Sequence, residues 1–265
     1  MPDTLEALDA RHIPSDWTAP LSLSEDLLNR AQPVVIALAG AGCSPAIYRD
    51  LDSVCSIPWR TLDWFRGEGA FDPVSIADRI AVLLARRAGP TFLAGHSLGA
   101  FLSLLIGLRH GASLGRRLSG LILSNTGART VGHGDPGLPD RILHHWTPQA
   151  QQAFLDACFH EPPPEPLAAH LRNYLAAVPV QRLHAAVAGL RVLDVLHELP
   201  GLRLPVLVAH GELDRKRSVQ TAREMAQALP RGRLVLLLAG HTPMVECPTG
   251  YHRAIQTFLT DLGSS

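Results

Sequence analysis

A serine, an aspartate and a histidine stand far apart in this 265-residue chain, yet each follows a short apolar segment. Ser97 lies in the sequence Gly-His-Ser-Leu-Gly, between the apolar run 91–94 and a second apolar stretch. This is G-x-S-x-G between an expected strand and an expected helix, the pattern of a nucleophile elbow. The glycines leave room in the tight turn, and the N–H groups of the following helix can stabilise an anion. The pattern predicts that Ser97 is a nucleophile.

Asp214 and His241 are the groups that a serine nucleophile needs. His241 follows the apolar run 233–239, and Asp214 comes shortly after the run 204–209. Open α/β sheets place their sites beyond the carboxyl ends of parallel strands, so these side chains are expected to meet at one edge. We therefore expect His241 to act as the base for Ser97 and Asp214 to orient its imidazole and stabilise the imidazolium.

Other side chains compete for these roles. Glu212 is a rival to Asp214, while Glu246 is expected to support the loop that holds His241. Cys43 follows a different apolar run and has no elbow, which favours a small loop filler over a nucleophile. The thirteen histidines include no H-E-x-x-H spacing, so we expect no metal site and no cofactor.

Apolar runs alternate with helical patterns along most of the chain. The expected strands are 33–39, 55–62, 90–95, 119–124, 204–209 and 233–239. The expected helices are 23–30, 45–53, 73–88 (with Asp72 as N-cap and Pro73 in the first turn), 98–110, 216–229 and 248–262. Such alternation indicates an α/β fold with a mostly parallel sheet flanked by helices.

The alternation stops after residue 125. Residues 138–200 contain helical patterns without a strand, at 138–146, 148–159, 165–177 and 179–196, broken by prolines. These helices leave the sheet and return to it, so we expect them to lie over the strand ends as a lid that excludes water and sets substrate size. Trp146 and Phe154 lie within them and are expected to line the substrate pocket, with ordinary surface and packing residues of a helix as the alternative.

These features together resemble the α/β-hydrolase superfamily over nearly everything from residue 33 on. Serine, acid and histidine follow one another in its order. The segment 40–44 is similar to its oxyanion loop, although the loop begins Ala-Gly rather than His-Gly. The resemblance implies an α/β-hydrolase fold, with a core of residues 1–128 and 201–265 and an inserted helical cap of residues 129–200. It also implies an oxyanion hole made by the backbone N–H groups of Ala41 and Leu98.

The segment 124–129 is similar to the corresponding part of 3-oxoadipate enol-lactonases and related small esterases. This similarity nominates a lactone or a small acidic ester as substrate, with Arg129 as a carboxylate binder in the pocket. The alternative for Arg129 is a solvated charge at the hinge of the cap.

Composition excludes several partners. Lys and Arg together number 24 and so do Asp and Glu, and no basic stripe stands out, so a nucleic acid partner is not expected. No signal peptide is evident and no apolar run approaches a membrane span, so no membrane partner is expected. The four cysteines are scattered, which is typical of a reduced cytoplasmic protein. The oligomeric state stays open, a homodimer included.

The sequence therefore predicts a serine esterase that cleaves a carboxylic ester or lactone of a small to medium substrate through an acyl-enzyme. A thioesterase or a carbon–carbon bond hydrolase would use the same three residues. A non-catalytic ligand receptor on the same scaffold is the alternative from another class.

Overall fold

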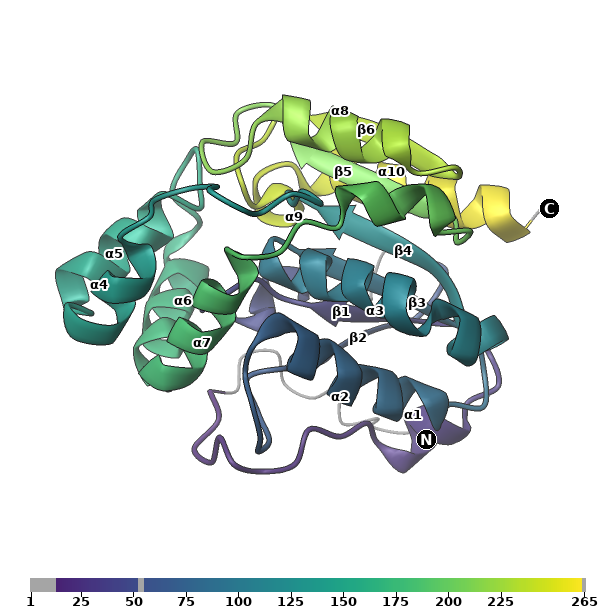
Figure 1. The fold of residues 1–265 in the computed structure, drawn as a ribbon, viewed down its shortest axis with the longest axis horizontal. Helices are drawn as coiled ribbons and strands as arrows, with labels where there is room; N and C mark the ends of the chain where they lie inside the picture. The colour runs from purple at the N-terminus through teal and green to yellow at the C-terminus, as the bar shows by residue number, and fades with distance from the viewer. Residues whose placement is uncertain (1–12, 52–54, 264–265) are drawn as a thin grey trace.

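The computed structural model describes residues 13–51 and 55–263, which build one parallel sheet with helices on both faces. Its strands run in the order β2-β1-β3-β4-β5-β6, and every neighbouring pair is parallel (Figure 1). The strands are β1 (Val34–Leu38), β2 (Trp59–Thr61), β3 (Thr91–His96), β4 (Leu118–Ser124), β5 (Val206–Gly211) and β6 (Gly232–Leu237). The predicted parallel sheet is confirmed.

Continuous apolar runs form the central strands because these strands are covered on both faces. Every residue of β1, β3 and β5 is buried. Val35 pairs with Phe92 and Ile36 with Leu93, so apolar side chains lie side by side across the ladder. Strands buried on both sides have no polar face, which explains why their sequences do not alternate.

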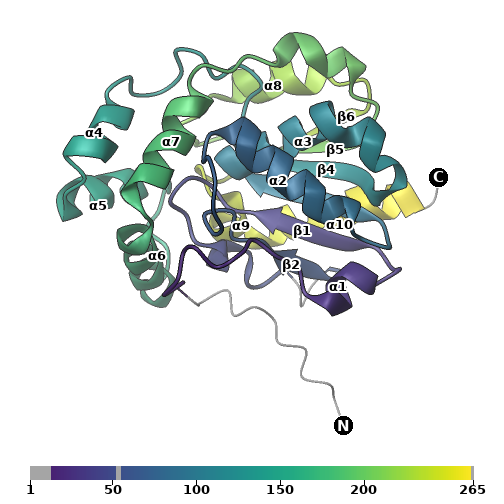
Figure 2. The same ribbon diagram turned by 60° about the horizontal axis from the view of Figure 1, so that its bottom comes forward.

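Helices cover the two faces of the sheet. On one face lie α2 (Pro73–Ala85), α3 (Leu98–Leu114) and α8 (Val219–Ala228), while α10 (Pro248–Gly263) packs on β5 and β6 from the other (Figures 1 and 2). The predicted cap of α2 is confirmed, because the carboxylate of Asp72 accepts the N–H groups of Val74 and Ser75. The remaining short helices outside the 125–205 segment are α1 (Glu25–Asn29), η1 (Pro45–Tyr48), η2 (Gly115–Arg117) and α9 (Pro243–Glu246).

The strand order reverses between β1 and β3, and this point positions the site. The chain moves outward from β1 to β2, then crosses back to β3 and continues toward β6. Neighbouring connections therefore leave opposite faces of the sheet, which opens a crevice beyond the carboxyl ends of β1 and β3. Ser97 follows β3 directly and the segment 39–44 follows β1, so both lie at this crevice.

Four helices stand between β4 and β5, and we call α4 to α7 the helical insertion. They are α4 (Leu138–His144), α5 (Pro148–Asp156), α6 (Glu165–Ala177) and α7 (Val180–Leu190), followed by the 3-10 helix η3 (Leu196–Gly201). Both views show the insertion gathered at one end of the sheet (Figures 1 and 2). Within residues 129–200 the one β-type pairing is an isolated bridge between Arg129 and Asp194. The division into a core and a cap domain stays a prediction.

Several elements are shorter than expected. The expected helix 45–53 is reduced to η1, while residues 52–54 lie outside the described residues. The expected strand 55–62 is reduced to β2. The expected helix 179–196 ends at Leu190, because the carbonyl of Leu193 accepts both the N–H and, at 2.6 Å, the hydroxyl of Thr130.

One helix differs from the expectation that no apolar run approaches the length of a membrane span. The segment Leu98–Arg117, which includes α3, is long and apolar enough to cross a membrane by length and composition. It packs against α2, β3 and β4, and 61% of its most apolar stretch is buried inside the fold. Its apolar character follows from its place as a core helix on the sheet.

Candidate active site

Ser97 occupies a strained turn between β3 and α3. Its φ of 53° and ψ of −116° lie in a region that residues with a Cβ rarely adopt. The surrounding backbone holds this conformation, since the Ser97 N–H donates to the Ser124 carbonyl at 2.8 Å and its carbonyl accepts the Phe101 N–H at 3.1 Å. The backbone therefore has the geometry expected of an elbow.

The two glycines of the G-x-S-x-G pattern are required by close backbone approaches. A Cβ on Gly95 would lie 2.4 Å from the nitrogen of Ala100. A Cβ on Gly99 would lie 2.2 Å from the carbonyl oxygen of Leu38, at the end of the neighbouring strand. Neither contact can be relieved without moving backbone, so the turn depends on glycine at both positions.

His241 and Asp214 meet as the sequence predicts. The Nδ1 of His241 donates to the Oδ2 of Asp214 at 2.8 Å, and both side chains are buried. Asn125 Nδ2 donates to the same oxygen at 2.8 Å. The other oxygen, Oδ1, accepts the backbone N–H groups of Lys216 at 2.7 Å and Arg217 at 3.0 Å. Four donors thus hold one carboxylate.

These donors keep Asp214 ionised. Burial by itself raises the pKa of Asp214, but the hydrogen bond and charge of His241, with the bonds from Asn125 and the Arg217 N–H, outweigh it. The pKa of Asp214 therefore falls below its usual range. A carboxylate that stays charged can hold the Nδ1–H tautomer of His241, which leaves the lone pair on Nε2.

Asn125 is a site residue that the sequence analysis missed. It is fully buried, has a φ of 49°, and its Nδ2 also donates to the Gly240 carbonyl at 3.1 Å. Asn125 thereby links Asp214 to the loop that carries His241. Its position directly after β4, at the edge where the other site residues lie, was the available signal.

His96 supports the backbone of His241. Its Nε2–H donates to the His241 carbonyl at 2.9 Å, and the two imidazole centroids lie 5.0 Å apart. Burial first, and then the neighbouring His241, lowers the pKa of His96 to about 3, so this imidazole is neutral. A neutral histidine that donates to a carbonyl positions the adjacent loop.

The rival side chains lie elsewhere. Glu212 is exposed. The carboxylate of Glu246 accepts the Thr242 N–H at 3.1 Å and the His160 N–H at 2.6 Å, so it ties the loop after His241 to the helical insertion, in line with the expected supporting role. Burial raises the pKa of the Cys43 thiol far above neutrality, so this thiol stays protonated.

The segment after β1 passes directly beside Ser97. A Cβ on Gly40 would lie 3.2 Å from the Cβ of Ser97. Trp64 Nε1 donates to the Ala39 carbonyl at 2.8 Å, and the Cys43 N–H donates to the Gly40 carbonyl at 3.1 Å. These bonds shape a loop that lacks the usual His-Gly start. Ala41 and Leu98 line the same cavity as Ser97.

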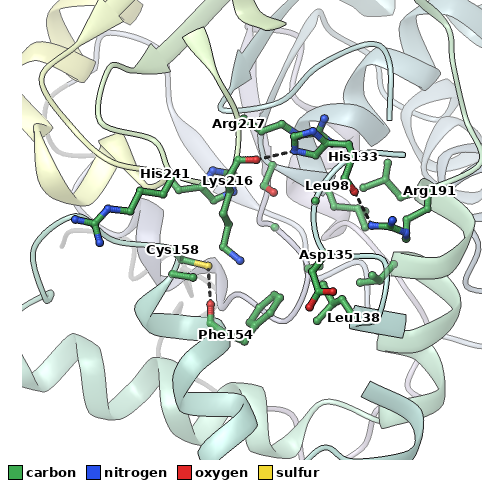
Figure 3. A pocket seen from close by; sticks show the side chains of 18 of the residues that line it. Leu98, His133, Asp135, Leu138, Phe154, Cys158, Arg191, Lys216, Arg217 and His241 are labelled. Carbon is green, nitrogen blue, oxygen red and sulfur yellow. Dashed lines mark hydrogen bonds between the residues drawn. The ribbon is translucent and has the colours of Figure 1, made fainter. Parts of the chain in front are cut away.

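A cavity of about 510 Å³ joins Ser97 and His241 to the helical insertion (Figure 3). Trp146 and Phe154 both line it, with ring centroids 5.7 Å apart in an edge-to-face arrangement. The expected pocket residue Arg129 is not among the lining residues. Its Nε pairs with Asp194 at 3.1 Å and its side chain is 61% exposed. The bridge to Asp194 turns Arg129 toward solvent, which corrects the prediction.

Among the described residues no group of three His, Cys, Asp or Glu side chains could hold a metal ion.

Comparison with known proteins assigns the family. A family model described as the alpha/beta hydrolase family matches residues 9–254. A segment of the polyketide synthase ThaQ of Burkholderia thailandensis is 30% identical over 250 residues, covering 90% of this chain but 11% of that protein. This chain therefore spans a small part of the length of that relative.

Solved structures agree in fold. The enol-lactonase of Burkholderia xenovorans LB400 has a TM-score of 0.73 and 19% identity, covering 87% of this chain and 92% of that one. The esterase EaEST of Exiguobacterium antarcticum has a TM-score of 0.75 and 19% identity, with the same coverage. Because the family model spans most of the residues and the fold agrees with it, this chain belongs to the alpha/beta hydrolase family.

Proposed function

We propose that this protein is a serine hydrolase that cleaves a carboxylic ester or lactone through an acyl-enzyme. The observation that carries the proposal is Ser97 on a strained elbow, in the same cavity as His241, whose Nδ1 is bound to the buried Asp214. Membership of the alpha/beta hydrolase family supports hydrolase activity.

The proposed chemistry follows from these positions. Ser97 Oγ attacks the acyl carbon while His241 Nε2 takes its proton, and Asp214 stabilises the imidazolium. The backbone N–H groups of Ala41 and Leu98 bind the oxyanion of the tetrahedral intermediate. His241 then gives the proton to the leaving group, and a water molecule activated by His241 hydrolyses the acyl-enzyme.

The helical insertion supplies much of the wall that faces Ser97. Residues of α4, α5 and α7 line the cavity, which is large enough for a small to medium substrate. We propose that the insertion acts as a cap that excludes water and selects the acyl group by size and shape. Trp146 and Phe154 offer the apolar surface for this selection.

A thioester is the second candidate substrate. The similarity to a segment of a protein named as a polyketide synthase is the observation that favours it. A carbon–carbon bond hydrolase would use the same three residues, and a ligand receptor on this scaffold would show no multiple turnover. We keep a small-molecule substrate, a cytoplasmic location and independence of nucleic acid, membranes and cofactors as predictions.

The proposal is tested with a panel of esters, lactones and thioesters of matched acyl length. We expect multiple turnovers by the wild type and a loss of about 10⁴-fold or more in kcat/KM in Ser97→Ala. A fluorophosphonate probe should label Ser97, as located by mass spectrometry. The exposed Ser113, in the same helix, provides the matched control Ser113→Ala, which should keep both activity and labelling.

Either of two results would overturn the assignment. One is a probe adduct on a serine other than Ser97 in the folded protein. The other is a stoichiometric reaction that stops after one turnover, which would favour a receptor over an enzyme.

A further inference from the structure

Positive charge gathers on the wall of the cavity. Among the described residues that line it, five carry a cationic side chain and one carries a carboxylate, although the whole chain has balanced charges. The cations are Arg141, Arg191, Arg215, Lys216 and Arg217, and the acid is Asp135. A cavity with this balance attracts an anion.

Two of these cations have their main partners inside the protein. Arg141 forms an ion pair with Asp135, the acidic residue of the cavity wall. Arg191 Nη1 donates to the His133 carbonyl at 2.5 Å. The other three cations lie together on the loop between β5 and α8, which holds residues 215–217.

Lys216 is the single lysine of the chain, and it reaches across the cavity. Its Nζ lies 4.4 Å from the ring centroid of Phe154. Figure 3 shows the Lys216 side chain pointing toward the Phe154 ring. In the part of the chain that the structure describes, no carboxylate lies within 4.0 Å of this Nζ. The charge of this ammonium and a hydrogen bond from it also act on the Cys158 thiol. A thiol is a weak acceptor, so the ammonium keeps its strongest hydrogen-bonding capacity for an incoming oxygen acceptor.

Arg217 lies next to Lys216 and is buried, with 8% of its surface exposed. Its Nη1 donates to the Arg129 carbonyl at 3.3 Å, and no described carboxylate forms an ion pair with it. The charge of Asp214 acts on Arg217, but both Asp214 oxygens already accept N–H donors. A buried guanidinium without a paired carboxylate is unfavourable, and a bound anion would relieve this cost.

The backbone at Lys216 is held firmly beside the reacting groups. Its N–H donates to Asp214 Oδ1 at 2.7 Å, and its carbonyl accepts the Nε2–H of His133 at 2.6 Å. The loop that orients the acid therefore also positions the cation. An anion bound to Lys216 would therefore be held by the same loop that orients the acid.

The opposite part of the wall offers an apolar surface with one unused donor. Trp146 Nε1 is buried and has no hydrogen-bond acceptor among the described residues. It belongs to the aromatic pair with Phe154, on which the lysine lies. A ligand that combines an apolar stretch with acceptor oxygens would match both features.

We propose that the substrate carries an anionic oxygen group, a carboxylate or a phosphate, that binds Lys216 and Arg217. Its apolar part packs on Trp146 and Phe154 while the acyl carbon meets Ser97. This inference rests on the proposed hydrolase function and narrows its substrate class.

The first test compares matched pairs of substrates. One pair is an aryl monoester of glutaric acid and the aryl ester of pentanoic acid, which differ by a carboxylate on the acyl part. The other pair is an acyl thioester of phosphopantetheine and of pantetheine, which differ by a phosphate on the leaving group. In at least one pair the wild type should prefer the anionic member.

Lys216→Met removes the charge and keeps much of the stem. We expect it to lower the anionic-to-neutral ratio of kcat/KM about 10-fold to 100-fold, the effect of losing a hydrogen bond to a charged group. Lys216→Arg should keep most of the preference. Arg223→Gln, an exposed residue on α8 outside the cavity wall, removes the same charge elsewhere and should keep the wild-type ratio.

The pairs distinguish the two sources of the anion. If Lys216→Met lowers the anionic-to-neutral ratio of kcat/KM in the glutarate pair, the anion lies on the acyl part of the substrate. If the variant lowers this ratio in the pantetheine pair, the anion lies on the leaving group. An unchanged ratio in both pairs, or equal losses on anionic and neutral members, overturns the inference.

A second test does not need turnover. Reductive methylation with ¹³C-formaldehyde keeps the charge and labels Lys216 and the N-terminal amine alone, so Lys216→Arg identifies the Lys216 resonance by its loss. In Ser97→Ala, glutarate or phosphopantetheine should shift this resonance saturably, and pentanamide or pantetheine should not. A resonance that no anion shifts overturns the inference even if esters are hydrolysed. A shift without hydrolysis by the wild type supports anion binding and counts against the proposed reaction.

Discussion

The strand ends and the first two helices of the insertion face each other across the cavity, and they are built differently. Every residue of β3 and β5 is buried, and Asp214 is held by four donors. By contrast, the buried residue of α4 is Ile142 and the buried residue of α5 is Leu155. The groups proposed to react therefore stand on a rigid edge. The aromatic wall, with Trp146 between α4 and α5 and Phe154 on α5, stands on a segment with few buried residues.

The third helix of the insertion resembles the core more than its neighbours. The Tyr174 hydroxyl of α6 donates to Asp63 at 2.8 Å, and His170 Nε2 lies 2.8 Å from the Ser44 hydroxyl. α6 thus joins the loop after β1 to the insertion. We infer that α4 and α5 adapt to a substrate while α6 keeps the proposed oxyanion loop in place.

The largest effect that tests this contrast is expected at the strand edge. Asp214→Asn should lower kcat about 10³-fold to 10⁴-fold, because the orientation and charge that support His241 are lost. Steady-state kinetics on a short ester measures the effect. The neighbouring exposed residue provides the control Glu212→Gln, whose effect should be far milder. The reverse ranking would mean that the wrong carboxylate was assigned.

A smaller effect is expected at Asn125, which acts through Asp214. Asn125→Ala removes the donors to Asp214 Oδ2 and to the Gly240 carbonyl, and should lower kcat about 10-fold to 100-fold with little change in KM. Kinetics and the thermal midpoint are measured together. Ser124→Ala, which instead loses a bond to the Tyr251 hydroxyl at 2.9 Å, is the matched buried control. A change confined to the thermal midpoint would assign Asn125 a structural role alone.

Substitutions in the aromatic wall across the cavity should change the selectivity for acyl length more than they change the rate on the shortest ester. Phe154→Ala or Trp146→Ala removes apolar surface, so kcat/KM for long acyl esters should fall about tenfold relative to the shortest ester. An acyl-length series measures the ratio. Leu143→Ala, on the exposed side of α4, should keep the wild-type profile. A uniform loss at every acyl length would remove the proposed division between edge and insertion.

The last effect is one on stability rather than activity, and it concerns acid conditions at the strand edge. The folded-state pKa of His96 is about 3, below its unfolded value of 6.5, so the unfolded state binds more protons between these values. This histidine's contribution to stability is complete above pH 6.5 and is lost as pH falls, by about 1.4 kcal/mol per pH unit. His96→Gln should make the free energy of unfolding fall less steeply from pH 6.5 toward pH 3.

Denaturant unfolding of both proteins at several pH values checks this prediction. Glutamine can still donate to the His241 carbonyl, so the variant should remain folded at neutral pH. His252, whose pKa burial also lowers, is only half-buried and lies outside the cavity wall, so His252→Gln should change the slope less. Equal slopes for wild type and His96→Gln would show that His96 does not stay neutral when folded.

The strand–helix alternation and the positions of Ser97, Asp214 and His241 could be predicted from the sequence alone. Each depends on local patterns: apolar runs that must be buried, glycines that permit a tight turn, and a polar residue directly after a strand. The cap of α2 at Asp72 is equally local. Because parallel strands end at one edge, residues distant in the chain could be placed near one another without any knowledge of side-chain contacts.

Which other polar residues belong to the site depends on contacts between segments that are distant in the chain. Arg129 pairs with Asp194, far along the chain, and turns away, while Lys216 reaches Phe154 on another element. Asn125 gains its role from contacts with Asp214 and Gly240. Such partners are chosen by how the insertion packs over the sheet, and a charged loop residue looks the same in sequence whether it meets solvent or a cavity.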